Sequence, residues 1–211
     1  MYVPEAFREH RQRILHALIR QHSFGTLITF GEGGLVASHL PFLLDPSRGL
    51  YGTLSGHLAR ANPQWESFAN GQEVLAVFQG PHAYISPSWY ETPLSVPTWN
   101  YVAVHAYGPP RLVTEDPALR SILEASVRTY EASFEEPWGM GRLPDDYVDH
   151  MIRAVVGFEI PIRRLEGKLK LSQNRPPANR QGVVNGLLRQ GGALSQATTY
   201  LMADLDEPSV P

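Results

Sequence analysis

The chain has 211 residues, of which 43% are hydrophobic and 18% are charged, values typical of a globular protein with one domain or one domain and an appendage. A net charge of −3 argues against a dedicated DNA clamp, while a local basic patch stays open. The chain has no cysteine, which excludes disulfides, thiolate metal sites and a cysteine nucleophile. It also has no apolar leader and no apolar run of membrane length, so we expect a cytoplasmic protein without a membrane anchor.

The first predicted element is an N-terminal helix. Pro4 suits a first helical turn, and apolar residues recur at helical spacing as far as Ile19. The period then becomes two, which is typical of β-strands. A β-hairpin is therefore predicted from the strands 24–30 and 35–40 and the turn 31–34.

Strands dominate the next part of the chain. They are predicted at 50–55, 73–79, 82–86 and 98–107. A short helix interrupts them after Asn62, a natural N-cap that is followed by Pro63 at the first helical position.

The second half of the chain mixes helices and strands. Asp116 and Pro117 begin a helix with one apolar side. A Pro- and Gly-rich loop leads to another helix near 145–153. Two strands follow at 154–160 and 163–172, and the tail 178–203 is predicted as two short helices separated by Gly191 and Gly192. Six or more short strands joined mostly by hairpins indicate an antiparallel barrel, a mainly β protein of the α+β class.

The strand 98–107 has two contrasting faces. Aliphatic side chains alternate with the larger side chains Trp99, Tyr101, His105 and Tyr107. The aliphatic face belongs in the core, so the aromatic face points outward. Such a face is covered by a flanking helix, a second subunit or a flat ligand, and the sequence leaves the three open.

Two places are suited to an anionic ligand. Lys168, Lys170 and Ser172 share one face of the last predicted strand, with Gln173 just beyond, and together they can bind a phosphate by charge-assisted hydrogen bonds. His57 and Arg60 precede the helix that begins near residue 62, and helix N-termini attract phosphates. The alternatives are a solvated basic face and an ordinary capped helix.

Other chemistries find little support in the sequence. The eight histidines form neither an HExxH motif nor a His-x-His pair, so no metal site is predicted. Residues 52–56 read GTLSG, one position away from the nucleophile motif of serine hydrolases, and they lie in a predicted strand. No P-loop is present, and no catalytic acid or base is identified.

Several long motifs together resemble one known family. ASHLPF, GHLARANPQW, FQGPHAYISPSWY, VPTWNYVAVHAYG and GKLKLSQNR are similar to the PaiB family, from the start of the chain to about residue 190. That family is described as negative transcriptional regulators and belongs to the FMN-binding split β-barrels. The resemblance implies a flavoprotein homodimer with FMN sites at the subunit interface.

The resemblance also implies boundaries and site residues. It predicts a split-barrel domain over residues 1–175, including the N-terminal helix, and a helical appendage over residues 176–211 packed on the same domain. The residues that it implies for the cofactor are His39, His57, Arg60, Trp99, Lys170, Ser172 and Gln173. Among these, Lys170, Ser172 and Arg60 are expected at the FMN phosphate, and Trp99 and His39 beside the ring.

Three functions follow from this resemblance. The first is an FMN-dependent oxidoreductase or sensor linked to transcriptional regulation. The second is a regulator that contacts DNA directly through the basic segment 163–189 and has no enzymatic activity. The third is a haem-binding or haem-utilisation protein, for which the candidate axial ligands are His39, His57, His82, His105 and Tyr101.

Overall fold

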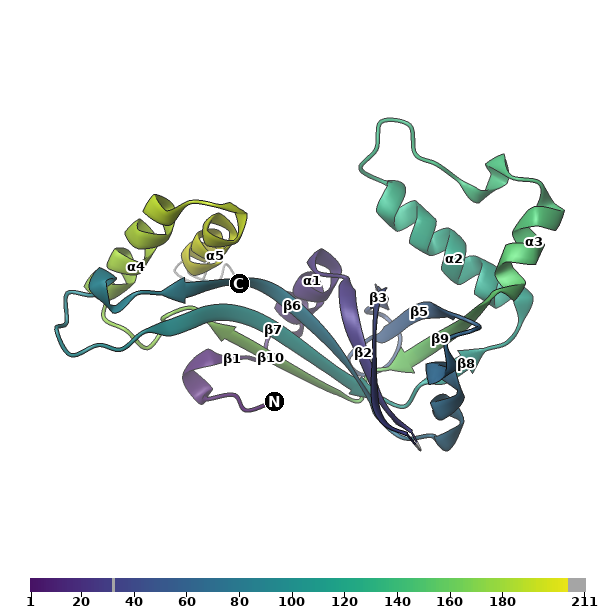
Figure 1. Cartoon of the computed structure of the whole chain (residues 1–211), viewed down its shortest axis with the longest axis horizontal. Helices are drawn as coiled ribbons and strands as arrows, with labels where there is room; N and C mark the ends of the chain where they lie inside the picture. The colour runs from purple at the N-terminus through teal and green to yellow at the C-terminus, as the bar shows by residue number, and fades with distance from the viewer. Residues whose placement is uncertain (32, 205–211) are drawn as a thin grey trace. The chain divides into compact units, whose positions relative to one another are not determined.

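The structure is a computed structural model that describes residues 1–31 and 33–204 (Figure 1). It is an α+β protein with two antiparallel sheets, which confirms the predicted class. The larger sheet has the strand order β1-β10-β7-β6-β2-β3, formed by β1 (Arg8–Glu9), β10 (Arg164–Lys170), β7 (Thr98–Gly108), β6 (Val74–Ile85), β2 (Phe24–Gly31) and β3 (Gly34–Pro41). The smaller sheet has the order β4-β5-β9-β8, formed by β4 (Leu43–Asp45), β5 (Thr53–Ala59), β9 (Val155–Pro161) and β8 (Arg111–Val113).

The helices fall mainly in the second half of the chain. The α-helices are α1 (Gln12–Gln21), α2 (Asp116–Glu131), α3 (Asp145–Arg153), α4 (Pro177–Gln190) and α5 (Ala193–Asp204). Short 3-10 helices lie at η1 (Glu5–Phe7), η2 (Pro63–Asn70), η3 (Pro87–Trp89) and η4 (Met140–Arg142). None of the described helices combines the length and the apolar character that crossing a membrane requires.

The chain divides into two compact units. Unit 1 contains residues 1–15, 79–104 and 166–211, and unit 2 contains residues 16–78 and 105–165. The strands β6, β7 and β10 contribute residues to both units. The expected division into 1–175 and 176–211 stays a prediction, and its last residues, 205–211, lie outside the described part of the chain.

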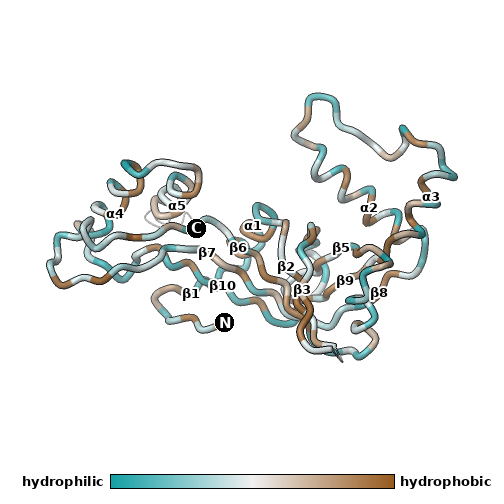
Figure 2. Tube along the Cα trace, in the orientation of Figure 1, coloured by the Kyte–Doolittle hydropathy of each residue, from teal (hydrophilic) through white to brown (hydrophobic). Residues whose placement is uncertain are grey.

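Unit 2 has an aromatic core between its strands. Phe42 makes edge-to-face contacts with Phe78 and Phe158, with ring centroids 5.3 and 6.1 Å apart. Gly56 allows this packing, because a Cβ atom there would lie 3.0 Å from the Phe158 ring. Figure 2 shows hydrophobic residues along the strands that supply this core. Burial of these large side chains is the main force that holds the two sheets of unit 2 together.

Unit 1 contains the pair of helices at the end of the chain, which pack on each other. Helix α4 packs on η3 through two glycines, because a Cβ atom at Gly186 would lie 2.2 Å from the Trp89 ring, and one at Gly182 would lie 2.0 Å from the Trp89 carbonyl oxygen. Helix α5 lies beside α4 (Figure 1). Its Met202 sulfur accepts a hydrogen bond of 3.6 Å from the buried amide of Asn100.

Most predicted elements are present. Asn62 caps η2 by accepting a hydrogen bond from the Gln64 backbone, as its place before Pro63 predicts. The hairpin β2–β3, helices α2 and α3, and the two tail helices also confirm their predictions. The predicted turn 31–34 includes residue 32, which lies outside the described residues.

Four predicted elements were wrong in their boundaries. The N-terminal helix begins at Gln12, because residues 5–9 form a 3-10 turn and the short strand β1. The strands predicted at 73–79 and 82–86 are the single strand β6. The strand predicted at 50–55 is β5, which begins at Thr53 after Gly52, whose φ of 88° is the left-handed conformation that favours glycine.

Candidate functional site

The outward face of β7 is partly open in unit 1. The alternation predicted from the sequence is confirmed, because Val102, Val104 and Ala106 are buried. Trp99 on the other face is 52% exposed and contacts Tyr84, 43% exposed, with ring centroids 5.9 Å apart. His82 lies beside the same indole at 6.2 Å. The Tyr84 ring meets the Trp99 indole edge-on, and this exposed aromatic surface remains available for a ligand or a second subunit.

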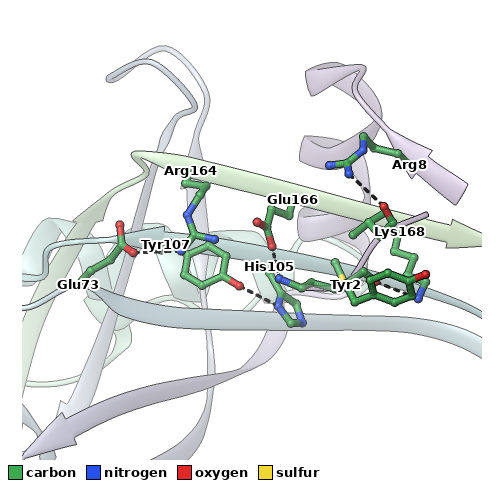
Figure 3. A network of polar contacts seen from close by, with 10 residues as sticks. Tyr2, Arg8, Glu73, His105, Tyr107, Arg164, Glu166 and Lys168 are labelled. Atoms are coloured by element: carbon green, nitrogen blue, oxygen red, sulfur yellow. Dashed lines mark hydrogen bonds and ion pairs between the residues drawn. The ribbon is translucent and has the colours of Figure 1, made fainter. Parts of the chain in front are cut away.

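The part of the β7 face that lies in unit 2 is occupied by other side chains. The guanidinium carbon of Arg164 is 3.4 Å from the centroid of the Tyr107 ring, and Arg164 also pairs with Glu73 at 3.2 Å (Figure 3). His105 Nδ1 lies 3.3 Å from the Tyr107 hydroxyl. These contacts give His105 and Tyr107 partners within the protein.

Three cations of unit 1, which we call the cation cluster, come from β10 and the turn after it. Lys168 is only 8% exposed, donates to the Tyr2 carbonyl at 3.1 Å and lies 5.2 Å from the centroid of the Tyr101 ring. Figure 3 shows its stem extending to Tyr2. The other two members are Lys170, which donates to the Thr98 hydroxyl, and Arg175, whose guanidinium lies 4.9 Å from the Tyr90 ring centroid.

The cation cluster carries positive charge that no carboxylate pairs with in the part of the chain that the structure describes. Burial lowers the pKa of Lys170, and the neighbouring charges of Lys168 and Arg175 lower it further. Among the described residues, none of the three forms an ion pair with a carboxylate. An anion placed beside Lys170 would therefore relieve a repulsion that the folded chain contains.

Ser172 and Gln173 shape the turn after β10. Ser172 has a φ of 65°, the left-handed conformation, and its buried hydroxyl lies 3.1 and 3.2 Å from the two amide atoms of Asn100. Gln173 accepts a hydrogen bond of 2.7 Å from the Leu171 backbone and donates to the Leu169 carbonyl. Both side chains are thus used within the protein, and they hold the turn that carries Arg175.

The other predicted site residues belong to unit 2. His39 is exposed on β3, and its Nδ1 lies 3.0 Å from the Thr26 hydroxyl. Arg60 donates from Nε to the Arg153 carbonyl at 2.7 Å and from Nη2 to the Val155 carbonyl at 2.9 Å. The guanidinium of Arg60 therefore holds the connection between α3 and β9.

His57 lies in an apolar setting. It projects from β5 into a cavity of about 400 Å³ whose other lining residues come mainly from α2, η4 and α3. Burial lowers the pKa of His57, which favours the neutral imidazole.

The structure thus separates the seven predicted residues into two groups. In unit 1, Trp99 lies at the start of β7, and Lys170, Ser172 and Gln173 lie at the end of β10 or just after it. Unit 2 holds His39, His57 and Arg60. The predicted set omits Thr98, Lys168 and Arg175. Lys168 and Arg175 belong to the basic residues that the sequence of 168–175 already shows. Thr98 is distant in sequence and comes near Lys170 only because β7 lies next to β10 in the sheet.

A metal centre is not found in the described part of the chain, where no group of three or more His, Asp or Glu side chains is placed to hold an ion.

Comparisons with known proteins identify the family of this chain. Residues 1–164 match the family described as "Putative FMN-binding domain". The chain is 34% identical over 204 residues to the protease synthase and sporulation protein PAI 2 of Bacillus subtilis, which covers 97% of each chain. It is also 32% identical over 230 residues to an uncharacterized protein of Emericella nidulans, with 90% of this chain and 92% of that protein covered.

Solved flavin proteins share the fold. The flavocytochrome Anf3 from Azotobacter vinelandii has a TM-score of 0.62 at 13% identity, with 80% of this chain and 72% of that chain covered. The FAD and heme binding protein from Mycobacterium smegmatis has a TM-score of 0.57 at 16% identity, with 76% and 71% covered. At these identities the likeness establishes the split-barrel fold alone.

Proposed function

This chain belongs to the PaiB family of FMN-binding-domain proteins, and from that membership we propose that it binds FMN and acts as a flavin-dependent oxidoreductase or a flavin-based sensor linked to transcriptional regulation. The FMN phosphate binds at the cation cluster of unit 1, and the flavin ring lies against the aromatic surface formed by Trp99 and Tyr84.

The observation that carries this proposal is the gathering of three cations around Lys170, none of which pairs with a carboxylate among residues 1–31 and 33–204. Lys170 is half-buried, its pKa is lowered by burial and by two neighbouring cations, and its ammonium donates a hydrogen bond to the Thr98 hydroxyl. A phosphate dianion supplies the missing negative charge. Charge-assisted hydrogen bonds of this kind contribute about 1.5–3 kcal/mol each.

Each residue has a distinct part in this arrangement. Lys170 and Arg175 bind the phosphate, and the Thr98 hydroxyl orients the Lys170 ammonium. Lys168, held by the Tyr2 carbonyl, adds positive charge from a buried position. Ser172 and Gln173 act through the turn that they stabilise. When bound, the flavin supplies the redox chemistry, and the protein supplies its binding and orientation.

A comparison of FMN with riboflavin tests the phosphate site directly, because the two flavins differ only by the phosphate. We expect the protein to bind FMN at least about tenfold more tightly than riboflavin, the difference that one charge-assisted hydrogen bond produces. Quenching of flavin fluorescence measures both affinities. Equal affinities would remove the cation cluster from the site.

We further propose a homodimer. The support is the exposed pair Trp99 and Tyr84, because large exposed aromatic side chains gathered on one surface are typical of interfaces. The second subunit then covers the aromatic surface together with the flavin ring. In this proposal the predicted ligand roles of His39 and Arg60 stay predictions.

The two alternative functions draw less support from the described contacts. Direct DNA contact relies on the basic segment 163–189, yet Arg164 is stacked on Tyr107 and paired with Glu73, and Lys168 is buried. The absence of any salt-sensitive mobility shift would exclude it. Haem binding relies on histidines, and a Soret band that appears when haem is added would favour it.

A further inference from the structure

An apolar cavity outside the proposed flavin site lies beside His57, and we call it the α2–α3 cavity. It lies wholly within unit 2, and its volume of about 400 Å³ falls in the range of small-molecule sites, roughly 300–1,000 Å³. Its lining residues are His57, Leu123, Ser126, Val127, Trp138, Met140, Leu143, Tyr147, Val148, Met151, Ile152 and Val155.

The floor of the cavity is shaped by the pairing of β5 with β9. The cross-strand neighbour of His57 is Gly157, which leaves the imidazole without a side chain beside it on that face. A Cβ atom at Gly157 would lie 2.7 Å from Leu119, so the glycine also lets α2 approach the sheet closely. Leu119 then packs with Val148 and Ile152 of α3 in a small buried core. The cavity therefore lies beside a packed core, with walls held in place by it.

The polar groups of the cavity are few and uncharged. No Lys, Arg, Asp or Glu is among its lining residues. The His57 ring makes no hydrogen bond within the described chain, and burial keeps it neutral, so it offers one donor and one acceptor to a ligand. A charged ligand would have to give up its hydration with no opposite charge in return, which is costly.

The rim of the cavity suits a flat ring. Trp138 and Tyr147 supply aromatic surface, and Met140 and Met151 supply thioether side chains that adapt to the shape of what they contact. These residues are partly or largely exposed, so a small molecule can enter from solvent.

We propose that the α2–α3 cavity is a second binding site, which takes an uncharged aromatic small molecule and holds it by a hydrogen bond to His57. The site shares no residue with the cation cluster, so it can be tested whether or not flavin binds. In a flavoprotein it would serve a substrate or an effector.

The four methionines of the chain provide a direct readout. Met140 and Met151 line the cavity, whereas Met202 lies in unit 1 and reports on non-specific effects. With methyl-labelled methionine, titration of the whole protein with 2-naphthol is expected to shift the Met140 and Met151 signals to saturation and to leave Met202 unchanged. The charged analogue 2-naphthoate is expected to bind at least about tenfold more weakly.

Two variants test the role of His57. His57→Phe keeps the size of the side chain and removes its hydrogen bond, so 2-naphthol affinity should fall about threefold to tenfold. His150→Phe makes the same substitution on the exposed face of α3, outside the cavity lining, and should leave the affinity unchanged. If His57→Phe proves unfolded by circular dichroism, Val127→Trp, which fills the cavity, should abolish the Met140 and Met151 shifts instead.

Four results would overturn the proposal. The first is the absence of a saturable shift of Met140 and Met151 with 2-naphthol, and the second is equal binding of 2-naphthoate. The third is competition between FMN and 2-naphthol for the same methionine signals, which would make the cavity part of the flavin site. The fourth is a shift of these signals on dilution of the protein alone, which would make the cavity a subunit interface. Weak FMN binding with normal 2-naphthol binding would count only against the proposed function.

Discussion

At the scale of single residues, Lys170 is a partly buried cation that lies close to two other cations. Its ammonium is partly removed from water and placed near Lys168 and Arg175, which lowers its pKa. A solvated basic face, the alternative that the sequence left open, would not bury Lys168 to 8% exposure. Three cations without a carboxylate partner in the described chain are more easily explained by an anionic ligand than by solubility.

Replacement of Lys170 should reveal how much of the FMN affinity depends on the phosphate. In Lys170→Met the affinity for FMN is expected to fall at least about tenfold, while that for riboflavin changes little. Arg189→Met, which removes an exposed cation of α4 outside the cluster, serves as the control and should bind both flavins normally. Fluorescence titration measures all four affinities, and parallel losses for FMN and riboflavin would argue against a phosphate contact.

The lowered pKa of Lys170 predicts how FMN affinity depends on pH. A bound phosphate favours the protonated ammonium, so the pKa of Lys170 should be higher in the complex than in the free protein. The affinity is then full below the lowered pKa of the free protein and declines as the pH rises toward the pKa of the complex. Titrations at a series of alkaline pH values check this, with Lys170→Met expected to show a flatter profile.

His57 should make the stability of the protein depend on pH. Its pKa is lowered by burial in the folded state, so on acidification the unfolded chain binds the proton first. This contribution to stability is present above the unfolded pKa of about 6.5 and is lost as the pH falls toward the folded pKa. The free energy of unfolding in urea should therefore drop more steeply from about pH 7 to about pH 5 in the wild type than in His57→Phe. Equal slopes would show that His57 is solvated.

At the scale of elements, helix α4 depends on two glycines. Gly186 lies against the Trp89 ring, and Gly182 lies against the Trp89 backbone. Helix propensity alone would favour alanine at both positions. Glycine makes the helix less stable, but it allows α4 to pack closely against Trp89.

Gly186→Ala should therefore destabilise the protein although alanine is the better helix former. The added methyl group would have to displace the Trp89 ring, and overpacking of this kind costs about 1–3 kcal/mol. Asn185→Ala, at the exposed neighbouring position, is the control and should be close to neutral. Urea unfolding measures both variants, and an unchanged or raised stability of Gly186→Ala would refute the packing described for α4.

The elements also show what local sequence could and could not predict. The hairpin β2–β3, the cap at Asn62 and the split tail helices follow from short-range rules and are confirmed. The continuous strand β6 could not be predicted in this way, because Gly80 and Pro81 are typical of a turn. In the structure Gly80 and Pro81 are both buried, so the alternation of buried and exposed side chains shifts by one residue while the strand continues. As a result, His82 and Tyr84 lie on the outward face.

The site was predictable to a similar degree. Lys170 and Trp99 follow from charge and alternation together with the family resemblance. The partners of Lys170 depend on which strands pair and on a turn that includes the left-handed Ser172, neither of which has a local sequence pattern. The α2–α3 cavity could not be predicted either, because it is lined by residue 57 and by residues between 123 and 155, which only tertiary packing brings together.

At the scale of the whole molecule, the exposed aromatic surface of unit 1 predicts self-association. Tyr84→Glu places a charge beside Trp99 and should shift the protein toward monomer by at least about tenfold in the dissociation constant. Tyr200→Glu, at an exposed position on α5, is the matched control. Sedimentation velocity over a range of concentrations measures both. A wild-type protein that stays monomeric would contradict the proposed homodimer.

An absorbance spectrum shows whether this split barrel is a flavoprotein. The protein is measured as purified and again after it is mixed with FMN and passed through gel filtration. We predict the two visible bands of an oxidised flavin in the protein fraction, weakened or lost in Lys170→Met. A protein fraction without flavin bands after this treatment would show that the protein does not bind FMN.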